Sequence, residues 1–122
     1  MEGLNLINSR VFEPGFVIAE ASGRAVAKTE VEWNQDVAKV WDAQLAELQT
    51  HEGFVGAIAF WKQDDSGIGL IFGFWDGIEH RLAYEKRSAN ARAIVSGLWH
   101  GTPTRARYTI SAATFKPRTT SG

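Results

Sequence analysis

The chain of 122 residues contains no cysteine, which excludes disulfide bonds, thiolate catalysis and zinc sites built from cysteine. Its three histidines are scattered without spaced carboxylates on one element, so no metal site is expected. No segment approaches the roughly 18 uninterrupted apolar residues of a membrane-spanning helix. The first residues, "MEGLNLINSRVFEPG", lack the pattern of a signal peptide. We therefore expect a cytoplasmic protein that binds no metal and no membrane.

Neither sign of charge dominates, because 13 basic residues face 14 acidic ones for a net charge of -1. Such a chain creates no overall field that would attract nucleic acid. The segment "GIGLIFG" tempts comparison with a phosphate-binding loop, but its glycines have the wrong spacing and lie inside an apolar strand pattern. No Gly-x-Ser-x-Gly motif is present, so a hydrolase nucleophile elbow is also absent.

The length and the hydrophobic fraction of 44% predict one globular domain over residues 1–122. Its core is expected at about 16–115, followed by a polar, disordered tail at 116–122. The role of the N-terminal segment 1–22 stays open. Five tryptophans are present, and each pairs a large apolar surface with an N–H group that needs an acceptor.

Hydrophobic periodicity predicts the order of elements. The alternation in "AVAKTEVEW" favours a strand at 25–33, and "FVIAEA" before it is either an additional strand or a lead-in arm. Helical spacing follows, with Asn34 as a possible N-cap and Gly53 as the stop. Two strands that are apolar on both faces, 54–61 and 68–75, form a hairpin around a polar turn.

A second helix is predicted from Gly77 or Ile78 to about Ser96, where Gly97 ends it. Asp76 and Glu79 have the spacing of a capping-box variant, so Asp76 is expected to cap this helix. The stripe containing Ile78 and Leu82 is expected to face the core. A final strand is predicted at 105–115.

This order predicts an α+β fold of the ferredoxin-like, split βαβ type, with an antiparallel sheet and helices on one face. The hairpin strands carry Val55, Ala57, Ala59 and Trp61 on one side and Phe54, Ile58 and Phe60 on the other. The face without helices therefore needs a cover, and a second copy of the sheet would provide it in a homodimer.

The segment "HEGFVGAIAF", the hairpin and the strand ending in "FGFWD" resemble the dimeric α+β barrel superfamily. Within it, the chain is most similar to the antibiotic biosynthesis monooxygenase family. The matching positions are Gly53 to Gly56 and Trp75, and the resemblance covers about 25–115. It implies oxidation of phenols without cofactors, in a pocket between sheet and helices. The family's first-strand asparagine has no match, because Lys28, Thr29 and Glu30 stand there.

The candidate site follows from this resemblance and from the spacing of the second helix. His80 and Tyr84 lie four residues apart and share one helix face. His80 or His100 would accept the substrate's proton, and Tyr84 would orient the oxyanion. The expected catalytic residues are thus His80, Tyr84 and His100, and the expected substrate-binding residues are Trp75, Trp99 and Phe74.

Other interpretations remain open at this stage. In one interpretation, His80 and Tyr84 are a pair of surface side chains without a functional role. In another, Trp99 is a hydrophobic plug and the neighbouring His100 faces solvent. His51 is expected to interact with the dipole of the first helix. The alternative functions are a non-catalytic small-molecule-binding or stress-associated dimer and, less favoured, a haem-binding or haem-degrading protein. Relatives of the haem-degrading type place their histidine in the region of Tyr84.

Overall fold

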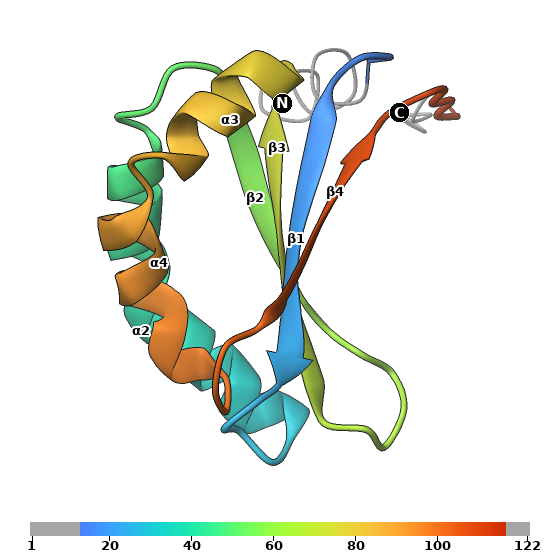
Figure 1. Ribbon diagram of the computed structural model, residues 1–122. Coiled ribbons are helices and arrows are strands. Elements are labelled where there is room, and N and C mark those ends of the chain that lie inside the picture. Colours follow the sequence, from blue (N-terminus) through green and yellow to red (C-terminus); the bar gives the residue numbers. More distant parts are fainter. Residues whose placement is uncertain (1–12, 117–122) are drawn as a thin grey trace, which may run out of the picture.

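The computed structural model describes residues 13–116, so the segment 1–12 and nearly all of the expected tail lie outside the described residues. A four-stranded sheet carries its helices on one face, and the strands twist strongly as they cross (Figure 1). The elements are β1 (Val17–Arg24), α2 (Glu30–Leu48), β2 (Phe54–Trp61), β3 (Ile68–Trp75), α3 (Ile78–Glu85), α4 (Ala89–Val95), the 3-10 turn η1 (Ser96–Leu98) and β4 (Thr104–Thr109).

The sheet has the strand order β2-β3-β1-β4, and every neighbouring pair is antiparallel. β1 and β3 thus lie in the centre, while β2 and β4 form the edges. The predicted α+β, ferredoxin-like fold is confirmed. Among residues 13–116, no helix is both long enough and apolar enough to cross a membrane.

The first strand is β1, so the prediction of a strand at 25–33 is wrong. Helix α2 begins at Glu30 instead of after Asn34, and Thr29 is its N-cap. The Thr29 hydroxyl accepts a hydrogen bond from the Glu32 backbone N–H at 3.2 Å, and the Glu32 carboxylate accepts one from the Lys28 N–H at 2.9 Å. This Thr-x-x-Glu pair satisfies backbone N–H groups that would otherwise lack acceptors at the start of the helix. The capping favours a helix from Glu30 over the strand that the alternation at 25–33 predicted.

The predicted hairpin is confirmed with its bounds at 54–61 and 68–75. A bulge between Phe54 and Gly56 shifts the register against β3. One extra residue moves a side chain to the other face of the sheet. Phe54 therefore joins the face covered by the helices, where its ring lies 5.4 Å from that of Trp75. The sequence-based assignment of Phe54 to the side of Ile58 and Phe60 is wrong for this reason.

The second helical region is divided into α3 and α4 rather than forming one helix from 77 to 96. At the break, the Ser88 hydroxyl donates to the Glu85 carbonyl oxygen at 3.2 Å. Such local bonds compete with the helical pattern. Gly77 is the N-cap of α3 and no side chain caps it, so the predicted capping by Asp76 is wrong. The last strand spans Thr104–Thr109 and is shorter than the predicted 105–115.

The helices pack on the sheet through the stripe that contains Tyr84, not through the predicted stripe that contains Ile78 and Leu82. Tyr84, Ala91 and Val95 are buried, whereas Ile78 and Leu82 are 43% and 41% exposed. The expectation that Ile78 and Leu82 face the core is therefore wrong. Helical periodicity shows which residues share a face of the helix. It does not show which face packs on the sheet, because that depends on how the helix docks in the fold.

Candidate functional site

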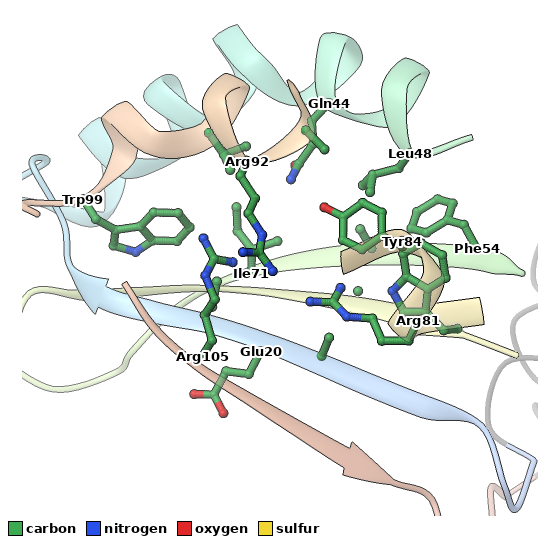
Figure 2. Close-up of a pocket in the computed structure, with 17 residues that line it drawn as sticks. Glu20, Gln44, Leu48, Phe54, Ile71, Arg81, Tyr84, Arg92, Trp99 and Arg105 are labelled. Carbon is green, nitrogen blue, oxygen red and sulfur yellow. The ribbon is translucent and has the colours of Figure 1, made fainter. Parts of the chain in front are cut away.

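A small cavity lies between the sheet and the helices, and its walls come from α2, α3, α4 and all four strands. Its volume is about 50 Å³, which is room for a few water molecules. Figure 2 shows Phe54, Tyr84 and Arg81 toward one end, the aromatic end. Arg92 and Arg105, together with Trp99, lie toward the other, the arginine end.

The aromatic end is built around Trp75 and Tyr84. Trp75 is fully buried, Tyr84 is 5% exposed, and their ring centroids are 4.8 Å apart. The rings of Tyr84 and His51 are nearly perpendicular, with an interplanar angle of 86° and centroids 4.8 Å apart. His51 thus packs as a buried side chain just beyond the end of α2, and its backbone N–H donates to the Leu48 carbonyl oxygen at 3.0 Å.

The arginines come from three elements and converge on the cavity. In Figure 2, Arg81 reaches in from α3, Arg92 descends from α4, and Arg105 rises from β4. The Arg81 guanidinium lies 4.8 Å from the Tyr84 ring centroid and 5.7 Å from that of Trp75, both cation–π distances. Its Nε donates to Glu85 Oε2 at 2.8 Å, which fixes the guanidinium in place.

Burial and charge set the protonation of the site. Burial raises the pKa of Tyr84, and the positive charges of Arg81, Arg92 and Arg105 oppose this increase. Loss of hydration lowers the pKa of Arg105, and the neighbouring positive charge of Arg92 lowers it further. Tyr84 therefore stays a neutral phenol near pH 7, able to donate a hydrogen bond.

The cavity adjoins an outer depression between α3, α4 and β4. Both share Arg81, Arg92 and Arg105 as lining residues, and the depression adds Glu85 and Arg107. The volume of the depression, about 410 Å³, is several times larger than that of the cavity. A ligand with a ring could lie in the depression while a small polar group points inward.

The structure brings together three of the sequence-predicted site residues. Trp75, Tyr84 and Trp99 line the cavity, and the Trp99 Nε1 donates to the Gly69 carbonyl oxygen at 2.9 Å. Phe74 lies on the other face of the sheet from Trp75, because neighbouring residues of a strand alternate.

Neither candidate base lines the cavity. His80 lies at the surface with a side chain 38% exposed, and its Nδ1 is 2.7 Å from Asp76 Oδ1. Its Nε2 is 3.6 Å from a Glu52 carboxylate oxygen. His100 lines a separate cleft with Arg24 and Lys28. The geometry therefore separates both histidines from Trp75 and Tyr84.

The sequence reasoning missed Arg81, Arg92 and Arg105. A signal was present in "RAR", residues 105–107, because alternation in a strand places both arginines on one face. That face is the one covered by the helices, since Arg105 pairs with Ala21 and Arg107 with Ala19. Arg81 follows His80 directly, and only the orientation of α3 shows that Arg81 points inward and His80 outward.

The site and the sheet topology define a small α+β protein with a water-sized cavity between its layers that adjoins a larger outer depression. No protein-family model matches the sequence, and a search of the curated proteins found no match. Several solved structures share the fold. The monooxygenase ActVA-Orf6 of Streptomyces coelicolor, solved with nanaomycin D, is 17% identical with a TM-score of 0.63 over 85% of this chain and 94% of that one.

Two further structures have the same fold. The cofactor-independent oxygenase SnoaB of Streptomyces nogalater is 12% identical, with a TM-score of 0.54 over 85% of this chain and 99% of that one. A Bordetella bronchiseptica protein whose description names antibiotic biosynthesis monooxygenases is 14% identical, with a TM-score of 0.58 over 78% and 96%. The chain thus has the fold of the antibiotic biosynthesis monooxygenases, as its sequence resemblance implied.

Proposed function

We propose that this protein is a homodimeric, cofactor-independent monooxygenase-like protein acting on a phenolic small molecule. The observation that carries the proposal is the cavity in which a neutral Tyr84 hydroxyl and three arginines surround a place for an oxyanion beside Trp75. Similarity in fold to ActVA-Orf6 and SnoaB supports the same reaction class.

The reaction requires no group other than the substrate and dioxygen. A phenol that has lost its proton reacts with dioxygen at a ring carbon, and the resulting hydroperoxide loses water to leave a quinone. One oxygen atom enters the product and the other leaves as water, so dioxygen takes up all four electrons. The positive charges of Arg81, Arg92 and Arg105 would favour the phenolate, and Tyr84 would donate a hydrogen bond to it.

This scheme assigns no protein base. His80 and His100 lie outside the cavity, so the proton would leave through the outer depression to water. Glu20 contributes to the cavity lining, but its carboxylate accepts a hydrogen bond from the Tyr108 hydroxyl at 2.7 Å, and Figure 2 shows it pointing away from the arginines. Trp75 would shape the inner wall of the cavity beside the oxyanion, while the ring system lies in the outer depression.

The homodimer is proposed through the sheet face that the described helices leave uncovered. Ile58, Phe60 and Tyr108 are each more than 40% exposed on this face. Phe60 and Phe72 pack there edge to face, with ring centroids 5.1 Å apart. A second copy of the same sheet face would remove these rings from water.

The second candidate is a non-catalytic protein that binds a phenolate or another small organic anion. The separation of both candidate histidines from the cavity favours it. Oxygen uptake with model hydroquinones distinguishes the two. For an oxygenase we expect uptake above the rate without protein, and a rate that falls about tenfold or more in Tyr84→Phe, because one oxyanion donor is lost. Ligand binding without oxygen uptake would support the non-catalytic binding protein and exclude the oxygenase.

A further inference from the structure

We propose that the arginine end of the cavity is a subsite for a carboxylate, so that the ligand is an aromatic acid rather than a neutral phenol. This inference rests on the proposed function in placing an aromatic ligand at this site. The inference gives that ligand a carboxylate in addition to its phenol. It also assigns Arg92 and Arg105 as the residues that would select for the carboxylate.

Charge balance is the first argument. Four arginines line the outer depression, and Glu85 is the carboxylate among its lining residues. Glu85 already binds Arg81 through Oε2 at 2.8 Å and lies 3.3 Å from Arg107 through Oε1. Within residues 13–116, Arg92 and Arg105 make no salt bridge. The site thus holds two guanidinium groups that no described carboxylate pairs with: Arg92, which is half-buried and contacts the Tyr84 hydroxyl, and Arg105, which is exposed toward the outer depression.

Unpaired donors give the second argument. The Arg92 Nε and the Trp75 Nε1 are buried without a hydrogen-bond partner in the described part of the chain. Both belong to residues that line the cavity, and both can only donate. Buried donors without acceptors are costly, so a ligand that supplies acceptor oxygens would restore what the fold leaves unsatisfied.

Geometry gives the third argument. Arg92 comes from α4 and Arg105 from β4, and Figure 2 shows their guanidinium groups approaching each other from opposite walls. Like charges held this way repel, and an anion between them would turn this repulsion into attraction. A planar carboxylate fits, because guanidinium groups bind it through paired N–H donors. The cavity volume of about 50 Å³ suits such a group, and the ring would remain in the outer depression.

The test compares three matched ligands by isothermal titration calorimetry at constant ionic strength. Salicylate carries a carboxylate beside its hydroxyl, salicylamide replaces the carboxylate by a neutral amide, and inorganic phosphate is an anion without a ring. We expect salicylate to bind about tenfold or more tightly than salicylamide, the scale of one charge-assisted contact. Salicylate should also bind more tightly than phosphate, because only salicylate fills the depression.

The variants Arg92→Gln and Arg105→Gln should each weaken salicylate about tenfold while leaving salicylamide within about twofold. Arg87→Gln is the matched control, because Arg87 is exposed in the turn between α3 and α4 and lines neither space. Circular dichroism melting shows whether each variant is folded.

Equal binding of salicylate and salicylamide, no binding of either, or an equal loss in Arg87→Gln would overturn the carboxylate subsite. Phosphate binding as tightly as salicylate would assign the arginines to a free inorganic oxyanion and would overturn the aromatic acid. These outcomes are independent of turnover, because salicylate binding is measured without oxidation. A protein that fails to consume oxygen but discriminates the two ligands would refute the monooxygenase reaction and retain this subsite.

Discussion

The indole ring of Trp33 lies directly against the backbone of Gly69. A Cβ added at Gly69 would overlap the six-membered part of that ring, and the Gly69 carbonyl oxygen accepts the hydrogen bond of Trp99. Trp33 is 1% exposed and packs 6.2 Å from Trp99, measured between ring centroids. One glycine near the start of β3 thus lets Trp33 of α2 and Trp99, which follows η1, pack together in the core.

Gly69→Ala is expected to lower the free energy of unfolding by about 1–3 kcal/mol, because a methyl group would overpack a rigid ring. Urea denaturation measures the change. Gly97→Ala is the control, since nothing lies within 4 Å of a Cβ at Gly97. If both substitutions lower the free energy of unfolding equally, the contact with Trp33 does not determine which side chain position 69 tolerates.

Thr29→Ala is expected to cost about 1 kcal/mol of stability, because the first turn of α2 loses the hydroxyl that accepts from Glu32 N. Thermal melting with a matched Thr102→Ala control measures the loss; Thr102 is exposed and makes no hydrogen bond in the described part. If Asn34→Ala instead produces the larger loss, the helix starts later than described.

Trp75→Phe is expected to weaken binding of an anionic aromatic ligand about threefold to tenfold, because the indole N–H that lacks a partner would no longer donate to it. Phenylalanine is preferred to alanine here. Trp75 is fully buried, and truncation to alanine would cost about 3–5 kcal/mol of stability and confuse folding with binding. Calorimetric titration of salicylate gives the affinity, and unchanged affinity would exclude the N–H as a ligand donor.

His80 is expected to titrate above its usual pKa of 6.5, since the hydrogen bond to Asp76 raises it and the charges of Glu52 and Glu79 add to the effect. A raised pKa stabilises the folded state below the unfolded value of 6.5, and this contribution disappears as pH rises through the folded pKa. The stability difference between the native chain and Asp76→Asn should therefore be present at about pH 5.5 and vanish at about pH 9.

Nuclear magnetic resonance titration of the His80 ring measures its pKa directly, and Asp76→Asn should move it toward 6.5. A stability difference that persists unchanged at high pH would mean that the Asp76 carboxylate stabilises the fold by a route other than the charge of His80. The backbone N–H of residue 76, which donates to the Gly53 carbonyl oxygen at 2.9 Å, is the same in both proteins.

Phe60→Glu is expected to convert a dimer of twice the 13.5 kDa chain mass into a monomer, because a charge would be buried against the partner sheet. Light scattering at micromolar concentration measures the mass. Val31→Glu is the control, since Val31 is 65% exposed on α2 and not on the sheet. A native chain that is already monomeric would refute the sheet-face dimer.

Local patterns in the sequence determined the hairpin, the antiparallel α+β architecture and the place of Trp75 at the end of β3. The apolar runs at 54–61 and 68–75 permit little else, because a strand that is apolar on both faces must be buried on at least one of them. The capping pair Thr29 and Glu32 was equally readable, and it would have placed the start of α2 correctly.

Tertiary packing decided which side of each element forms the site. The helix after Trp75 offers two stripes of similar apolar character, and only the docking of α3 and α4 turns Arg81 and Tyr84 inward while leaving His80 and Ile78 outside. The bulge at Phe54 reverses one side chain, which no periodic pattern reveals. The meeting of Arg81, Arg92 and Arg105 depends on three elements separated along the chain. The alternation in "RAR" places Arg105 and Arg107 on one face of a strand, but only long-range packing brings Arg81 and Arg92 to that face.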